Sequence, residues 1–110
     1  GKVLLSYLSP KSQQEWLDQY PLKSLTKYTY TDNQAFLALL QQIRADEFCY
    51  SAEEHELGVH ALAVPIYSHR ADVVAALNIV SPTGRTSKDY LLQHILPLLQ
   101  ETAREFRQFI

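Results

Sequence analysis

The chain has 110 residues, of which 46% are hydrophobic, and a formal net charge of -2. This length suits one domain that can bury a core without disulfides or metal ions, and the charge argues against a stand-alone nucleic-acid binder, which normally shows a basic face. The single cysteine, Cys49, has no partner for an internal disulfide, and the sequence shows no leader and no apolar run long enough to cross a bilayer. A soluble, cytoplasmic domain without membrane contact is therefore predicted.

The first third of the chain is predicted to be mostly helical. Residues 1–8 place apolar side chains at helical spacing, but no capping residue and no initiator Met precede Gly1, which indicates a fragment of a longer protein. Ser9–Pro10 is a helix-start signal, because serine caps free amides and proline at the first helical position loses no hydrogen bond. This helix is expected to end at Tyr20, before a proline. Residues 22–30 show no clear period and predict an extended connection.

The middle of the chain predicts one helix and one strand. Thr31 and Gln34 form the pattern of a capping box, and residues 36–43 place apolar side chains at the i, i+3, i+4 and i+7 positions of a helix. Residues 47–51 alternate between apolar and small or polar side chains, which is typical of a short strand.

The last part predicts a β-hairpin followed by a helix. Residues 58–67 and 73–81 are rich in β-branched and small apolar side chains and are separated by a polar segment. Thr86 and Asp89 form another capping box, and a helical stripe then runs to the end of the chain through Leu91, Ile95, Leu98, Thr102 and Phe106. Pro97 lies inside this stripe and is expected to kink the helix.

The predicted order of elements is helix, helix, helix, strand, hairpin, helix, which indicates the α+β class with an antiparallel sheet packed against helices. Three strands are few for such a sheet, so we expect further strands to precede this sequence.

Asn78 is the most informative single residue, because it lies in the centre of an apolar strand. An amide buried there without partners costs about 1–3 kcal/mol, so protein, water or ligand must satisfy it. If the hairpin loop has an even number of residues, Asn78 shares a face of the sheet with Ala61 and Ala63, and Val80 lies on the same face. Small side chains around one amide are typical of a small-molecule pocket. The alternative is that helices pack closely on the alanines and Asn78 bonds to a neighbouring backbone.

Signs of a metal site or of catalysis are weak. An acidic and histidine-containing group precedes and enters the hairpin: Glu53, Glu54, His55 and His60. Its spacing fits no standard zinc pattern, so a solvated acidic loop is the preferred interpretation. Cys49 has no demonstrable base, and no G-x-S-x-G motif occurs. The sequence therefore predicts no enzyme activity, no metal and no cofactor.

Several segments together carry a family resemblance: E-E-H-E-L-G-V-H-A-L-A-V-P-I, V-V-A-A-L-N-I-V-S-P, R-T-S-K-D-Y-L and L-P-L-L-Q-E-T-A-R-E-F. In this order they resemble the effector-binding domain of IclR-type bacterial transcription regulators, and G-K-V-L-L-S-Y-L is similar to the family's G-K-A-x-L-A helix. The resemblance covers essentially the whole chain. It implies a GAF/profilin-like sensor domain whose ligand sits between sheet and helices. It also implies an N-terminal DNA-binding winged helix-turn-helix outside this chain, so that residues 1–110 are the C-terminal part of a single effector-binding domain.

The resemblance also implies a ligand site. In the family, backbone amides near Gly1 hold the ligand carboxylate, since a helix N-terminus attracts anions. Other pocket positions correspond to Ser51, Ala61, Asn78 and Val80. Members that bind very small keto acids are expected to have Asp, Cys, Ser and Ser there. The Ser, Ala, Asn and Val of this chain imply a less acidic, less polar pocket for a larger ligand.

Within the family, the sequence is most similar to activators that respond to aromatic acids such as p-hydroxybenzoate or protocatechuate. This implies a ligand-controlled activator of aromatic catabolism genes, working as a homodimer or tetramer. His60 should face away from Ala61 and act as a structural or interface histidine. Three alternatives stay open: a sensor domain with another output, such as a signalling enzyme; a small enzyme that uses Cys49 or the acidic loop; and a scaffold with a filled core.

Overall fold

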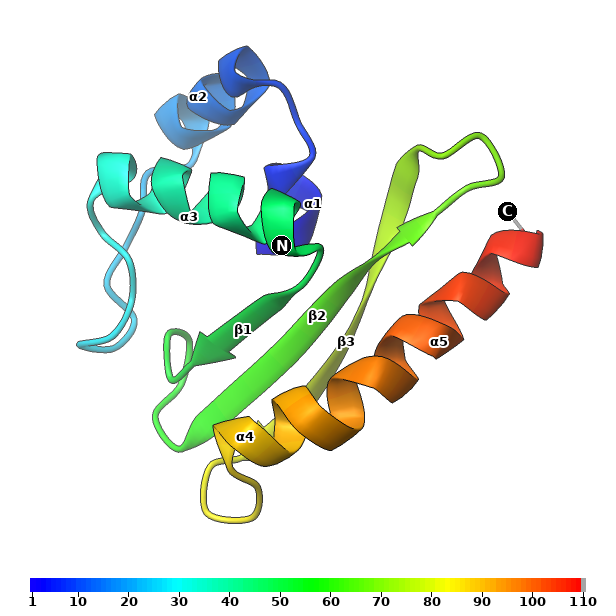
Figure 1. The fold of residues 1–110 in the computed structure, drawn as a ribbon. Coiled ribbons are helices and arrows are strands. Elements are labelled where there is room, and N and C mark those ends of the chain that lie inside the picture. The colour runs from blue at the N-terminus through cyan, green and yellow to red at the C-terminus, as the bar shows by residue number, and fades with distance from the viewer. Residues whose placement is uncertain (110) are drawn as a thin grey trace.

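The computed structural model describes residues 1–109 as a three-stranded antiparallel sheet with helices on both faces (Figure 1). The elements are α1 (Lys2–Ser6), α2 (Pro10–Gln19), α3 (Asn33–Asp46), β1 (Cys49–Ala52), β2 (Val59–Tyr67), β3 (Val73–Pro82), α4 (Lys88–Tyr90), a π-helical turn (Leu91–Ile95), α5 (Leu96–Phe106) and a 3-10 turn (Arg107–Phe109). The predicted α+β class with an antiparallel sheet is confirmed. No helix within residues 1–109 combines the length and the hydrophobicity that a membrane span needs.

Strand β2 lies at the centre of the sheet, and its two faces differ in side-chain size. Leu62, Val64 and Ile66 are buried and pack in one cluster with residues of α5. Ala63, on the other face, packs against the second cluster, which α1, α2 and α3 contribute. The large side chains therefore anchor α5, and the small ones face the other three helices.

The register of the hairpin confirms that the small residues and Asn78 share a face. Ala61 is opposite Val80, and Ala63 is opposite Asn78. Between Tyr67 and Val73 the loop has an odd number of residues, but an irregularity at Ile66/Tyr67 shifts the register. The predicted alternation therefore holds, although the even-numbered loop on which it depended does not occur.

Two helix starts differ from the sequence prediction by one residue. Asp32, rather than Thr31, caps α3, because its Oδ1 accepts the amide N–H two residues on at 3.2 Å. Ser87, rather than Thr86, caps α4 by accepting the amide N–H three residues on at 3.0 Å. In both cases the neighbouring Asp or Ser is a better N-cap than the predicted Thr. The predicted cap of α2 by Ser9 is confirmed.

The predicted kink at Pro97 takes the form of a π-helical turn just before it. The N–H of Leu96 bonds to the carbonyl oxygen of Leu91, and Pro97, which lacks an amide hydrogen, falls in the first turn of α5. The wider turn rotates the helix that follows, so part of the predicted apolar stripe is wrong. Leu98 and Phe106 are exposed, whereas Leu96 and Ala103 are buried against the sheet.

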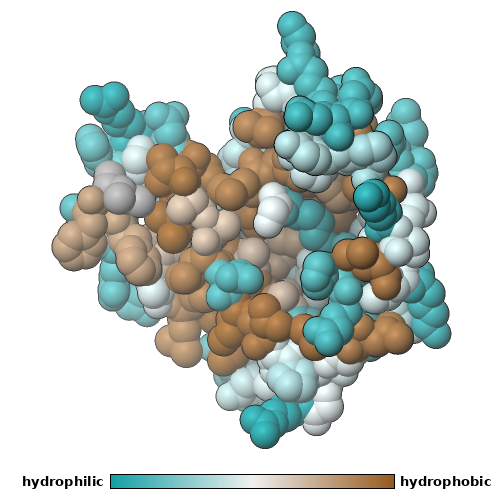
Figure 2. Space-filling view, turned by 180° about the vertical axis from the view of Figure 1, so that it is seen from behind, coloured by the Kyte–Doolittle hydropathy of each residue, from teal (hydrophilic) through white to brown (hydrophobic). Residues whose placement is uncertain are grey.

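The outer strand β3 leaves apolar side chains uncovered. Val74, Ile79 and Val80 are exposed, and Figure 2 shows hydrophobic side chains gathered across the centre of the face behind the view of Figure 1. An apolar edge strand of this kind is a surface for further contacts. That further strands precede this sequence stays a prediction.

A chain of hydroxyl groups connects α1, β2 and the end of α3. The Tyr67 hydroxyl donates to Glu47 Oε1 at 2.9 Å and lies 3.0 Å from the Tyr7 hydroxyl, and the two rings meet edge to face. Burial raises the pKa of Tyr67 well above its ordinary value, and the hydrogen bonds with Tyr7 and Glu47 add to the rise. The fold therefore favours the protonated phenol.

Tyr67→Phe should make stability less dependent on alkaline pH. Because the folded state raises this pKa, the contribution of Tyr67 is complete below the unfolded-state pKa of about 10 and is lost as the pH rises above it. Urea unfolding at pH values from 8 to 11 should show a steeper decline for the wild type than for Tyr67→Phe. The exposed Tyr20 provides the matched control, Tyr20→Phe. Parallel declines for the wild type and Tyr67→Phe would contradict this account.

Candidate functional site

A cavity of about 650 Å³ lies between the small-residue face of the sheet and helices α1 to α3. All five residues predicted for the ligand site line it: Gly1, Ser51, Ala61, Asn78 and Val80. A smaller cavity of about 130 Å³ shares four of these residues and extends along the sheet toward Cys49 and Ala63. The structure therefore brings the predicted residues together around one space, and their role in binding stays a prediction.

The wall opposite the sheet comes from residues that the sequence analysis did not assign to the site. It consists of large apolar side chains: Leu5, Trp16, Leu22, Leu25 and Phe36. Leu5 and Phe36 belong to the adjoining core cluster, and Trp16 and Leu22 pack against it. Helical periodicity indicates that such residues face inward, but only the small side chains across from them turn part of the core into a cavity. An aromatic ring could pack between these two walls.

Asn78 is exposed to this cavity rather than buried in the core. Within residues 1–109 its side chain takes part in no hydrogen bond, so the alternative of a bond to a neighbouring backbone is wrong for this part of the chain. Both the amide N–H donors and the carbonyl acceptor are consequently available to a ligand.

The rim of the cavity carries an ion pair between Lys2 and Glu54. Lys2 Nζ lies 2.7 Å from both carboxylate oxygens of Glu54, and each side chain is only 18% exposed. The acidic segment is thus a rim that pairs with α1 through Glu54, and the predicted solvated loop holds for its exposed residues His55 and Glu56. Within residues 1–109 no group of three or more His, Cys, Asp or Glu side chains could hold a metal ion.

Backbone contacts hold this acidic rim in place. Glu53 adopts a left-handed conformation with φ 56°, and its carboxylate accepts the N–H of Gly58, which has φ 79°. The hydroxyls of Thr26 and Thr29 donate to the backbone carbonyls of Glu53 and Glu54. Residues 22–30, predicted to be extended, instead contain a turn, because Thr29 accepts the N–H groups of residues 25 and 26. The turn thereby supports the rim from outside the sheet.

His60 faces the opposite side of the sheet, as predicted, and is 2% exposed. Its Nδ1 lies 2.8 Å from the Tyr50 hydroxyl and its Nε2 lies 2.9 Å from Thr86 Oγ1, which also contacts Ser81 Oγ at 2.7 Å. Burial raises the pKa of Tyr50, with a further contribution from Glu53, so the phenol stays protonated beside the imidazole. This network fastens the loop before α4 to the sheet.

Residues 1–108 match the family model described as bacterial transcriptional regulator IclR, C-terminal. The chain belongs to the IclR family. It is 69% identical over 110 residues to the Pca operon regulatory protein of Acinetobacter baylyi and 47% identical to the p-hydroxybenzoate hydroxylase transcriptional activator of the same organism. It is covered completely in both comparisons but spans only about 40% of the length of these relatives.

Solved domains of bacterial transcription regulators share the fold. A double mutant of the PobR inducer-binding domain from Acinetobacter, in complex with 3-hydroxybenzoic acid, superposes with a TM-score of 0.97 at 48% identity. This comparison covers 99% of the present chain and 62% of the PobR chain. The C-terminal domain of the Escherichia coli regulator KdgR gives a TM-score of 0.86 at 31% identity, covering 97% and 65% of the two chains.

A double-mutant cycle should detect the pairing of Lys2 with Glu54. We expect Lys2→Gln and Glu54→Gln to be coupled by about 1 kcal/mol in the free energy of unfolding, because each charge is partly shielded and loses the same partner. Lys11 and Glu15 are a control pair, since they lie 4.0 Å apart with side chains 87% and 65% exposed and should show almost no coupling. Equal coupling in both pairs, measured by urea unfolding, would show that the rim pair has no special role.

His60→Ala should destabilise the fold by about 1–3 kcal/mol, because it leaves the Tyr50 hydroxyl without its partner and Thr86 with Ser81 alone. His55→Ala is the matched control: His55 is exposed at the rim and its loss should cost less than about 0.5 kcal/mol. Chemical denaturation measures both. An unchanged free energy of unfolding in His60→Ala would refute the structural role of this histidine.

Proposed function

We propose that this chain is the ligand-sensing domain of a DNA-binding transcription activator whose effector is a small aromatic carboxylate, such as p-hydroxybenzoate or protocatechuate. The observation that carries the proposal is the cavity of about 650 Å³, in which the unpartnered amide of Asn78 faces an apolar wall. Two relatives named for regulation of the pca operon and of p-hydroxybenzoate hydroxylase support the aromatic acid. The PobR domain solved with 3-hydroxybenzoic acid supports it as well.

The proposed binding mode follows from the two walls of the cavity. The ring packs between Ala61 on the sheet and the apolar side chains of the helices, which favours a flat apolar body. The carboxylate lies toward Gly1, at the start of α1, where Lys2 neutralises Glu54. Asn78 then either donates to the carboxylate or accepts from a phenolic hydroxyl.

In the proposed mechanism, ligand binding stabilises one of two arrangements of the whole protein. A ligand shifts such a balance only through its differential affinity for the two states. The bound acid would touch α1, the rim and the sheet together, so its contacts depend on how these elements are placed. Winged helix-turn-helix domains outside this chain would read DNA, and a homodimer or tetramer in the cytoplasm would match its half-sites.

The proposal excludes catalysis. Cys49 is buried and its Sγ lies 3.5 Å from Ser51 Oγ, with no histidine beside it among the contacts of the described residues. Mass spectrometry should therefore recover the bound aromatic acid unchanged after prolonged incubation. Turnover of the acid by the protein would refute this part of the proposal.

Asn78→Leu should weaken binding of p-hydroxybenzoate about tenfold, because a hydrogen bond to a charged or phenolic group is lost. Titration calorimetry on the intact protein with benzoate, p-hydroxybenzoate and protocatechuate measures this. A larger loss for p-hydroxybenzoate than for benzoate would place Asn78 at the hydroxyl, and equal losses would place it at the carboxylate.

The control is Asn33→Leu, which changes the only other asparagine, an exposed residue at the start of α3 outside the cavity lining. Unchanged binding by Asn78→Leu would remove Asn78 from the site. Failure of the wild type to bind any of the three acids would overturn the proposed effector class.

A further inference from the structure

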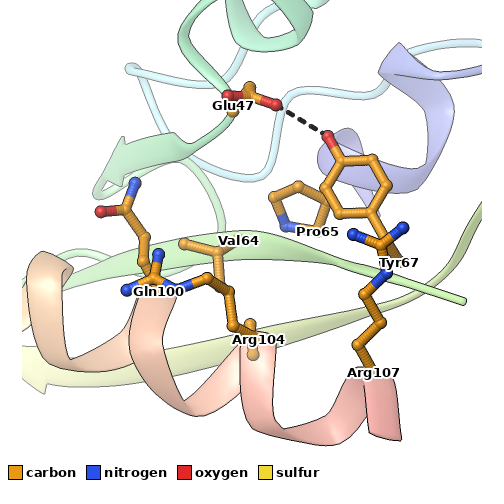
Figure 3. Close-up of a pocket in the computed structure, with 8 residues that line it drawn as sticks. Glu47, Val64, Pro65, Tyr67, Gln100, Arg104 and Arg107 are labelled. Atoms are coloured by element: carbon orange, nitrogen blue, oxygen red, sulfur yellow. Dashed lines mark hydrogen bonds between the residues drawn. The ribbon is translucent and has the colours of Figure 1, made fainter. Parts of the chain in front are cut away.

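Another cavity, of about 290 Å³, lies between α5 and the end of β2. Its floor is apolar, formed by Val64, Pro65 and Ala103. Figure 3 shows Gln100, Arg104 and Arg107 reaching from the helix into this groove, with Glu47 and Tyr67 on the opposite side. None of these residues lines the larger cavity. The groove is therefore a separate space with its own polar groups.

The charges in the groove are unbalanced. Within residues 1–109 neither Arg104 nor Arg107 forms an ion pair with a carboxylate. The Nε–H of Arg107 donates to the backbone oxygen of Ser68 at 3.1 Å, which orients the guanidinium and leaves its terminal N–H groups for another acceptor. Glu47 accepts the Tyr67 hydroxyl with Oε1 and retains a second oxygen. Two cations and one anion leave one positive charge uncompensated.

We propose that this groove binds a small hydroxylated monocarboxylate, independently of the larger cavity. One guanidinium takes the carboxylate, since charge-assisted hydrogen bonds from arginine are among the strongest in proteins, and the other, at the far end of the groove (Figure 3), adds positive charge to it. The free oxygen of Glu47 accepts the ligand hydroxyl at the opposite wall. The apolar floor covers the body of the ligand, and the charges of the bound site balance.

The groove is also connected to the larger cavity through ordered contacts. Tyr67 lines the groove and bonds to Tyr7, which ends α1, and the first residues of α1 line the larger cavity. Strand β2 contributes to both spaces, through Ala61 in one and Pro65 in the other. Both spaces thus border β2, and the contact of Tyr67 with Tyr7 joins the groove to the end of α1.

Equilibrium dialysis of the intact protein with labelled p-hydroxybenzoate, up to about 1 mM, counts the sites. We expect two molecules per chain for the wild type and one for Arg104→Gln/Arg107→Gln. Arg104→Gln alone, a change at an exposed position, should weaken the second site about tenfold. The control Arg85→Gln changes an exposed arginine outside the groove and should keep two sites.

Two related probes test the chemistry of the groove. Benzoate lacks the hydroxyl and should bind there about tenfold more weakly, and methyl p-hydroxybenzoate lacks the anion and should not bind there. Circular dichroism and urea unfolding verify that the arginine variants fold. Two outcomes would overturn the inference. Either the wild type binds one molecule and the arginine variants bind it equally well, or the double variant still binds two molecules.

Asn78→Leu separates the two proposals. If both hold, this variant weakens the site in the larger cavity about tenfold and leaves the affinity of the site that depends on Arg104 and Arg107 unchanged. A single wild-type site that the arginine changes abolish and Asn78→Leu leaves intact would support the groove and refute the proposed effector cavity.

Discussion

The alternation of side-chain size along β2 is the constraint on which the rest of the structure depends. Successive residues of a strand point to opposite faces, so one segment of nine residues builds two different environments. Leu62 and Val64 are almost fully buried and hold α5 against one face. Ala61 and Ala63 leave room on the other. A shift of the register by one residue would bring the leucine and valine into the cavity and detach α5.

The short helix α1 is held in position by its contacts with other parts of the fold. It has five residues and no side-chain cap, so its position depends on tertiary contacts. Val3 and Ser6 are buried, Lys2 pairs with Glu54 at the rim, and Tyr7 meets Tyr67 at the far end of β2. The helix is thus held by the loop between β1 and β2 at its first residue and by the end of β2 at its last. A ligand that contacts the first residues of α1 would strengthen or weaken these contacts. It could thereby change the position of α1 relative to the sheet.

The sequence was sufficient for those features that depend on local pattern. Strand alternation located Asn78 on the face of Ala61 and Ala63, and Ser9 identified the start of α2. Features that depend on tertiary geometry could not be predicted. The π-helical turn contains one residue more than an α-helical turn, so it rotates α5 and changes which leucines are buried. A pattern with the period of an α-helix does not predict this rotation.

For the same reason, only part of the site could be predicted from the sequence. The residues on the sheet followed from pairing and from family resemblance, whereas Trp16 and Phe36 follow only from the position of the helices above the sheet. The order of the acidic rim likewise depends on Thr26 and Thr29, more than twenty residues earlier in the chain. A pattern of four acidic and histidine residues contains no sign of such remote support.

The charges around the larger cavity restrict the ligand further. Glu53, Glu54 and Glu56 line the rim, and Lys2 compensates only one of these carboxylates. The field at the entrance therefore disfavours ligands with several negative charges. A single carboxylate is best accommodated at the Gly1 end, where Lys2 neutralises Glu54. Because the local electrostatics contribute little net attraction, most of the affinity must come from burying an apolar body against Trp16 and Phe36. An aromatic monoanion meets both conditions, whereas a small, highly charged acid meets neither.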